Sequence, residues 1–186
     1  MVKKLLIKKT RKGFGLFASK NFKKDEKILH VDLTKLRKYN LKEIGKLPES
    51  EKIHSDFIGD GKYVIDNSIA SYINHSCNPN CYAKMNSMTK RDIYALRDID
   101  KGEELTHDYT STSIDQFAGK GFWKFKCNCG SKYCRKVIHG DFFKMPKKWQ
   151  QKYYNYLPPF IKIKYKSYFL ILNMDNYPMY TIVYMT

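Results

Sequence analysis

The sequence predicts an α+β protein that is mostly β and forms one domain of small curved sheets with a short appendage. At 186 residues the chain is long enough to bury one sizeable hydrophobic core. Hydrophobic residues make up 42% of it, which argues against disorder throughout. Its fifteen tyrosines and eleven phenylalanines suit small β-sheets better than a helical bundle. These observations together indicate the fold class.

Short strands are predicted along the first part of the chain. Residues 3–31 alternate basic and apolar positions around Gly13 and Gly15, which predicts short strands joined by a tight turn. The stretches KYVIDNS (62–68) and RDIYALRDI (91–99) are rich in β-branched and aromatic residues, so they also predict strands. The first hundred residues are therefore expected to be mostly β.

A variable insert interrupts this β pattern. Residues 33–53 have a loose helical spacing of leucine and isoleucine that is broken by Pro48. Neither a clear strand period nor a full helix is visible here. We interpret the region of about 32–60 as an insert into the domain.

The composition changes again in a C-terminal extension, 141–186. A helix is predicted to begin at Pro146 and to stop at Pro158, and a strand-like, tyrosine-rich tail is predicted to follow it. Lysines interleaved with aromatic rings could stack on single-stranded nucleic acid. Packing of the aromatic face on the domain, or on a second subunit, is the favoured interpretation, and an oligomer is compatible with it.

The chain is strongly basic. Its formal net charge is +17, and lysine supplies 30 of the 35 basic residues. Such a field favours polyanions, for example nucleosomal DNA, or acidic protein surfaces as neighbours. A solvated lysine-rich surface explains the same composition equally well. Charge alone therefore identifies no partner.

No membrane or export segment is expected. The N-terminal stretch MVKKLLIKKT has too few apolar residues for a signal peptide. The apolar run YFLIL (168–172) is too short to span a bilayer. We therefore expect a soluble intracellular protein, in a compartment where cysteines are more often metal ligands or free thiols than disulfides.

The five cysteines predict a metal site. The segment CNCGSKYC contains Cys127, Cys129 and Cys134, and three thiolates at this spacing can reach three corners of a tetrahedron. A fourth ligand must come from elsewhere in the chain, and Cys77 and Cys81 are the remaining thiols. A redox pair would more often have the spacing C-x-x-C near a βαβ unit. A structural zinc site that links the two segments is therefore the preferred interpretation.

Four motifs in order carry a family resemblance. They are RKGFGLFA (11–18), SYINHSCNPNC (71–81), GEELTHDY (102–109) and CNCGSKYC (127–134). The first is a poor dinucleotide fingerprint, because it lacks the third glycine and the following helix. Over residues 8–140, the ordered set closely resembles the SET-domain protein-lysine methyltransferases with a cysteine-rich post-SET segment.

The resemblance implies a SET-domain fold with a knot-like threaded segment. In that family the Asn-His-Ser-Cys stretch passes beneath the loop that carries the Glu-Glu-Leu-x-x-Asp-Tyr strand, a rare exception to the avoidance of threading. Polar atoms buried at such a crossing need internal partners, which explains the polar density of residues 71–81. The implied division is a SET domain at 1–110, a zinc-stapled post-SET segment at 111–140 and the extension at 141–186.

The resemblance also implies a bound cofactor and a complete metal site. S-adenosylmethionine (AdoMet) is expected at the first two motifs, because glycine lets the backbone approach the cofactor closely. Cys77 is the implied fourth zinc ligand, beside Cys127, Cys129 and Cys134, which leaves Cys81 free. The implied cofactor-binding residues are Lys12, Gly13, Phe14, Gly15, Asn74, His75, Phe125 and Ile138.

The resemblance also implies a catalytic centre at Tyr109, whose hydroxyl would orient the substrate amine. His107 stands where the family usually has Phe or Tyr, a position that influences how many methyl groups are transferred. Ser71 is a further departure, because the family often has a large residue there. Tyr63 and Tyr72 are candidate channel walls, although tyrosines of the core would look the same.

These motifs predict AdoMet-dependent methyl transfer to a protein lysine, with a histone tail as the leading substrate. A nuclear or chromatin-associated location would follow in a eukaryotic or viral setting. The alternatives are a catalytically silent SET fold that binds chromatin or another polyanion, and a zinc-stapled nucleic-acid binder. The second alternative leaves Tyr109 and the glycine turn unexplained.

Overall fold

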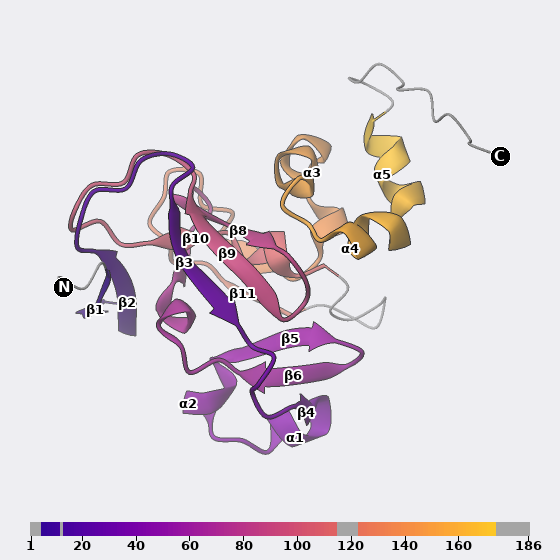
Figure 1. Ribbon diagram of the computed structural model, residues 1–186, viewed down its shortest axis with the longest axis horizontal. Coiled ribbons are helices and arrows are strands. Elements are labelled where there is room, and N and C mark those ends of the chain that lie inside the picture. The colour runs from indigo at the N-terminus through magenta and orange to yellow at the C-terminus, as the bar shows by residue number, and fades with distance from the viewer. Residues whose placement is uncertain (1–4, 12, 115–122, 174–186) are drawn as a thin grey trace.

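The computed structural model describes residues 5–11, 13–114 and 123–173 (Figure 1). In these residues the strands form separate sheets of two or three strands, which confirms the α+β, mostly β fold class. The strands are β1 (Leu5–Thr10), β2 (Gly13–Ala18), β3 (Lys27–Asp32), β4 (Tyr39–Asn40), β5 (Ser55–Gly59), β6 (Lys62–Ile65), β7 (Asn74–His75), β8 (Cys81–Met85), β9 (Lys90–Ala95), β10 (Thr106–His107), β11 (Lys124–Lys126) and β12 (Val137–His139). The helices are α1 (Leu41–Gly45), α2 (Glu49–Lys52), α3 (Lys147–Tyr154), α4 (Pro159–Lys164) and α5 (Lys166–Asn173), with 3₁₀ turns η1 (Ile69–Tyr72), η2 (Tyr109–Thr112) and η3 (Phe142–Lys144).

The first two strands form the antiparallel hairpin that the glycine turn predicts. Thr10 pairs with Gly13 at the closed end, where Gly13 has a φ of +109°, a conformation that residues with side chains rarely adopt. Further along β2, Leu16 is buried in the core and accepts a backbone hydrogen bond from Leu105 at 2.7 Å. The hairpin is therefore anchored to the segment that leads into Tyr109.

The antiparallel sheet β3-β9-β8 forms the centre of the main core. Two alternate residues of β9, Ile93 and Ala95, are buried, as the two-residue period of a strand requires. Other buried members of this core are Leu16, Phe22, Val31, Leu33, Val64, Ile73, Ile99 and Leu105. The strand predicted within 91–99 is thus confirmed as the middle strand of the sheet.

The insert folds into its own sheet, in the order β4-β6-β5, with two short helices. Asn40 and Glu43 form a capping box that starts α1. Pro48 precedes α2, so the break expected at this proline separates two short helices. The sequence analysis did not predict β5, because Ser55–Gly59 has little β propensity and becomes a strand through pairing with β6.

The parallel pair β7–β10 joins two of the sequence motifs. Beyond the pair, the Ser76 amide donates to the His107 carbonyl at 3.1 Å. The Asn80 side chain accepts from the Thr106 amide at 2.8 Å and donates to the Glu104 carbonyl at 2.9 Å. Polar residues of the 71–81 segment therefore satisfy the backbone of the crossing, as expected from their density.

The C-terminal extension packs on the outer side of β8, where Figure 1 shows α3, α4 and α5 grouped together. Its buried residues share a second core with residues of the SET-like region: Met85, Met88, Ile114, Phe142, Tyr153, Leu157, Ile161 and Phe169. The Met85 amide also donates to the Tyr156 carbonyl at 2.8 Å. The prediction of a strand-like tail is wrong for residues 166–173, which form α5 and pack on this core through Phe169. The rest of the tail lies outside the described residues.

No helix in the described part of the chain is long and apolar enough to cross a membrane. The division at residues 110 and 140 remains a prediction.

The packing of the extension gives a test of its contribution to stability. Ile161 is fully buried in the second core, whereas Ile163, two residues away, is 75% exposed. Ile161→Ala is expected to lower the free energy of unfolding by about 2–4 kcal/mol, through lost transfer energy and a cavity. Ile163→Ala should change it by no more than about 0.5 kcal/mol. Urea unfolding of both variants measures the difference, and equal values would contradict the packing.

Candidate functional site

Tyr109 lies at the start of η2, directly after the β7–β10 crossing. Its backbone amide donates to His75 Nδ1 at 3.2 Å, and its hydroxyl donates to the Ile73 carbonyl at 3.0 Å. Both ends of the residue are therefore held by the 71–81 segment. Burial raises the pKa of the Tyr109 phenol to about 12. The hydroxyl is consequently neutral over the physiological pH range.

A cleft with a volume of about 430 Å³ opens beside Tyr109. The insert supplies one wall, with Ile44 and Phe57, and the segment before the cysteines supplies another, with Trp123 and Phe125. Tyr109 joins these two walls. The cleft is therefore built from three parts of the chain that are distant in sequence.

Aromatic rings line the inner part of this cleft in a row. The Trp123 and Phe125 rings stack with centroids 5.4 Å apart, and Phe125 meets Tyr109 edge-on at 6.4 Å. On the other side, the His107 ring lies 4.9 Å from that of Tyr109. Of the two candidate wall tyrosines, Tyr63 lines the cleft, whereas Tyr72 packs on Phe14. These rings form an aromatic part of a cleft whose remaining lining includes charged and polar side chains.

His107 is neutral in the folded protein. Burial, together with the positive charge of Arg91 and the neighbouring His75, lowers its pKa to about 3. Its Nδ1 atom is buried and has no hydrogen-bond partner among the described residues. A buried ring nitrogen without a partner can hold a water molecule or a substrate group. His107 therefore adds polarity to the cleft but no charge.

Three of the four charged groups of the cleft pair with one another, and the fourth, Lys52, pairs with Glu49 outside the cleft. Arg91 forms an ion pair with Asp56 and lies 3.7 Å from Asp66. Both carboxylates and Lys52 line the cleft, so two acidic and two basic side chains face it. The lining is thus formally neutral in a protein with a net charge of +17. The sequence analysis missed this cluster, because residues 56, 66 and 91 have no recognisable spacing.

The predicted cofactor residues of the first two motifs lie together on the hairpin side of Tyr109. The Asn74 side chain donates to the Phe14 carbonyl at 3.0 Å and to Glu104 Oε1 at 2.6 Å. A Cβ atom on Gly15 would lie 2.5 Å from Glu104 Oε1, so a larger residue there would displace the Glu104 side chain from Asn74. At Gly13 an added Cβ would meet nothing within 4 Å, which leaves open space above the exposed strand.

The other predicted cofactor residues have different surroundings. His75 is buried, and its ring meets that of Tyr109 at 5.3 Å. Phe125 and Ile138 pair across β11 and β12, but Phe125 lines the cleft whereas Ile138 is buried. Lys12 lies outside the described residues. Tyr109 therefore contacts both the cofactor set, through His75, and the cleft.

Four cysteines converge beneath this site. The sulfur atoms of Cys77, Cys127, Cys129 and Cys134 all lie within 4.8 Å of one another, so they could ligate one metal ion. The Arg135 backbone amide donates to Cys77 Sγ at 3.3 Å, and the Lys136 backbone amide donates to Cys134 Sγ at 3.4 Å, an arrangement that suits thiolate ligands. Cys81 is separate and fully buried, and burial raises its pKa to about 12.

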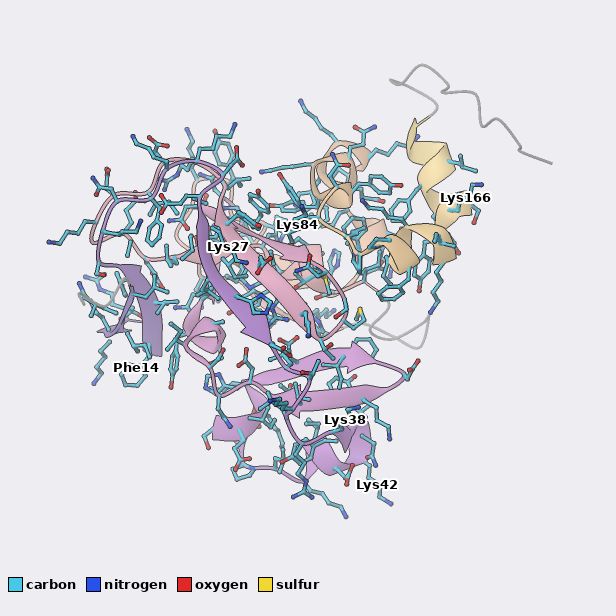
Figure 2. The ribbon with its side chains drawn as sticks, in the orientation of Figure 1. Phe14, Lys27, Lys38, Lys42, Lys84 and Lys166 are labelled. Atoms are coloured by element: carbon cyan, nitrogen blue, oxygen red, sulfur yellow. The ribbon has the colours of Figure 1, made fainter. Side chains whose placement is uncertain are left out.

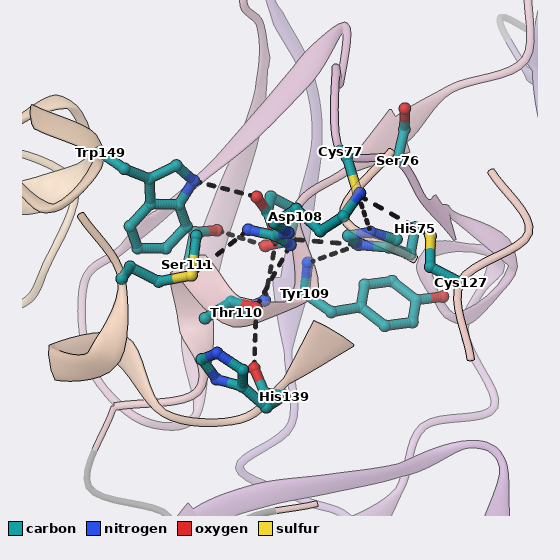
Figure 3. A network of polar contacts seen from close by, with 12 residues as sticks. His75, Ser76, Cys77, Asp108, Tyr109, Thr110, Ser111, Cys127, His139 and Trp149 are labelled. Atoms are coloured by element: carbon teal, nitrogen blue, oxygen red, sulfur yellow. Dashed lines mark hydrogen bonds and ion pairs between the residues drawn. The ribbon is translucent and has the colours of Figure 1, made fainter. Parts of the chain in front are cut away.

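A buried carboxylate connects these parts, and Figure 3 shows its network. Asp108 is 1% exposed and accepts hydrogen bonds from Arg135 Nη2 at 2.7 Å and from Trp149 Nε1 at 3.1 Å. His75 Nε2 lies 3.3 Å from the Cys77 sulfur. Sequence reasoning assigned no role to Asp108, although its place directly before Tyr109 in the motif was a usable signal.

Comparison with known proteins identifies the family. A family model described as "SET domain" matches residues 13–110, more than half of the chain. The chain belongs to the SET-domain family. Similar curated proteins include Histone-lysine N-methyltransferase ATX2 of Arabidopsis thaliana, 33% identical, set-2 of Caenorhabditis elegans, 35%, and SETD1B of Homo sapiens, 34%. Each match covers 68% of this chain, but only 12%, 9% and 6% of the respective relative.

The match to the SET-domain family covers part of the site. It includes β2 of the glycine hairpin, the β7–β10 crossing, Cys77 and Tyr109, whereas β1 precedes it. The segment with the other three cysteines and the C-terminal extension lie beyond it. In this SET domain, therefore, one wall of the cleft and most of the cysteine cluster come from outside the family match.

The depressed pKa of His107 predicts a pH-dependent stability. In the unfolded chain His107 becomes protonated as the pH falls below 6.5, whereas in the folded protein its pKa is about 3 and it stays neutral. The free energy of unfolding therefore decreases as the pH falls from 6.5 toward 3. The loss should reach about 2 kcal/mol between pH 7 and pH 5. His107→Phe keeps a ring and removes the titration. Urea unfolding at both pH values should therefore give a smaller loss for the variant than for the wild type, and identical losses would show that His107 is solvated.

Proposed function

We propose that this SET domain is an AdoMet-dependent protein-lysine N-methyltransferase, with histone lysines as the substrate. The observation that carries the proposal is the position of Tyr109, between the predicted cofactor residues of the first two motifs and the aromatic part of the cleft. The similar curated proteins are named histone-lysine N-methyltransferases, which supports the reaction and the substrate class. A nuclear, chromatin-associated location follows from that substrate.

AdoMet suits the groups that meet on the hairpin side. Exposed backbone at Gly13 and Phe14 lies beside the Asn74 amide, and Glu104 supplies a carboxylate for a cationic ligand. Bound there, AdoMet would supply an electrophilic methyl group on a sulfonium. His75 would contribute through its backbone. Ile138 and Phe125 are the proposed apolar contacts of the adenine.

The cleft would make the lysine amine reactive. A free lysine has a pKa of about 10.4, so near neutral pH nearly all of it is protonated and cannot attack. The rings of Phe125, Trp123 and Tyr109 would desolvate the ammonium, which favours loss of its proton to solvent before transfer. Because the His107 ring is uncharged near neutral pH, it would add no charge beside the amine.

Tyr109 would orient the amine. Its hydroxyl proton is committed to the Ile73 carbonyl, so the oxygen lone pairs remain to accept from the amine. Because the phenol pKa is about 12, Tyr109 would not remove the proton itself. Tyr109 would instead align the amine with the methyl group. Such alignment supplies much of the rate acceleration of an in-line displacement. A water molecule held by His107 would limit the number of methyl groups that fit.

Charge is consistent with a cationic peptide in the cleft. Within the cleft, acidic and basic side chains balance, so the local field is far less repulsive than the net charge implies. The labelled lysines in Figure 2 come from β3, the insert, β8 and α5 and are spread over the surface. We infer that most of the basic charge is solvated. Contact with nucleosomal DNA and an oligomeric state remain predictions.

We further propose that the four-cysteine cluster holds zinc. A tetrahedral site with Zn–S bonds of about 2.3 Å has sulfur atoms about 3.8 Å apart. The Cys77 and Cys127 sulfur atoms are 3.8 Å apart, and the other pairs lie within 4.8 Å. The ion would fasten the cysteine segment, and with it Phe125, to the strand that supports Tyr109.

The zinc proposal predicts one equivalent of zinc per chain. Cys134→Ser should abolish stoichiometric zinc, measured by metal analysis, and should lower the unfolding temperature. Cys81→Ala removes the thiol outside the cluster and should retain the metal. Zinc retained by Cys134→Ser, or lost from Cys81→Ala, would contradict the ligand set.

The function is tested by transfer of radiolabelled methyl groups from AdoMet to core histones, nucleosomes and a histone-free lysate. Tyr109→Phe should lower kcat by about 10²–10³-fold, because it removes one aligned hydrogen-bonding group in the transition state. The control Tyr133→Phe removes the same group from a side chain that is 60% exposed and should match the wild type. Label in the lysate alone would keep the reaction and reject histones. Absence of both label and AdoMet binding would instead support a silent SET fold.

A further inference from the structure

A residue of the C-terminal extension reaches the residue next to the proposed catalytic tyrosine. Trp149 lies on α3, and its indole Nε1 donates to Asp108 Oδ2 at 3.1 Å. The same carboxylate accepts from Arg135 and from the Thr110 amide through Oδ1. Core, cysteine segment and extension thus meet at one buried carboxylate (Figure 3).

Asp108 in turn fixes the backbone at Tyr109. It caps η2, in which Tyr109 is the first residue, through the bond from the Thr110 amide at 3.2 Å. The Asp108 carbonyl accepts from the Ser111 hydroxyl at 2.6 Å. Rotation of this carboxylate would therefore disturb the turn that directs the Tyr109 ring toward Ile73.

Trp149 is held firmly enough to impose this orientation. Its ring packs against Phe142 with centroids 5.3 Å apart and against Tyr153 at 4.5 Å. Tyr153 is 2% exposed and belongs to the second core. The indole N–H is thus directed by packing against residues that do not line the cleft, and Trp149 does not line it either.

We propose that Trp149 is a positioning residue for Tyr109, so that the C-terminal extension contributes to the geometry of the catalytic centre. The effect passes through Asp108: the indole N–H holds one carboxylate oxygen, which leaves the other to cap the turn. A buried carboxylate that loses one donor reorients or admits water, and either change loosens η2. The catalytic part of this inference rests on the proposed methyltransferase function.

The test compares two variants of the full chain. Trp149→Phe keeps an aromatic ring in the second core and removes the N–H. Ile161→Val removes one methylene from the same core without touching Asp108, and it controls for loss of stability alone. Trp149→Phe is expected to lower kcat about tenfold, the effect of one lost hydrogen bond to a charged group, with the KM values for AdoMet and peptide unchanged. Ile161→Val should retain the wild-type kcat.

A second measurement does not depend on activity. Amide hydrogen exchange of Tyr109 and Thr110, followed by NMR, should accelerate in Trp149→Phe and stay at the wild-type rate in Ile161→Val. An active wild type with an unchanged kcat in Trp149→Phe would overturn the inference. If the wild type is inactive, the proposed function fails separately, and exchange then decides: acceleration confined to Trp149→Phe supports positioning, and unchanged exchange overturns it.

Discussion

The parallel pairing of β7 with β10 is the constraint on which the rest of the site depends. It is short, but it sets side by side a strand that leads to Cys77 and a strand that leads to Tyr109. The Tyr109 amide and hydroxyl both bond to the 73–75 stretch, and the His75 ring approaches the Cys77 sulfur. Any movement of one strand would therefore shift the proposed nucleophile-orienting group and a metal ligand together.

Neutrality at the site follows from burial more than from composition. The chain has a net charge of +17, yet the cleft pairs Arg91 with two carboxylates, and desolvation keeps both Tyr109 and His107 uncharged. A basic protein that binds a basic peptide needs such a region, because exposed lysines elsewhere are screened by salt whereas charges within a cleft are not. Global charge is thus a poor guide to the substrate of this chain.

The sequence predicted the parts of the site that lie in continuous motifs. The glycine hairpin, the β9 strand and the grouping of Cys127, Cys129 and Cys134 follow from local spacing, and the structure shows all three. Spacing left Cys77 and Cys81 equally open as the fourth thiol, and the family resemblance implied Cys77, which lies in the cluster. Groups joined only by the fold escaped prediction, since nothing in the order of residues relates Arg91 to Asp66 or Trp149 to Asp108. The helix α5 escaped for a similar reason: its apolar run YFLIL (168–172) is too short to distinguish a strand from a helix, and its packing on the second core through Phe169 is a tertiary contact.

The network at Asp108 bears on where the functional unit ends. The family match stops at residue 110, but the carboxylate at residue 108 takes two of its donors from Arg135 and Trp149. A carboxylate that is 1% exposed cannot replace those donors with bulk water without opening the core around it. The cysteine segment and the extension are therefore linked to the SET domain by hydrogen bonds to Asp108 as well as by apolar packing. A boundary drawn at the edge of the family match would pass through this network, so a unit that keeps the donors of Asp108 has to extend beyond Trp149.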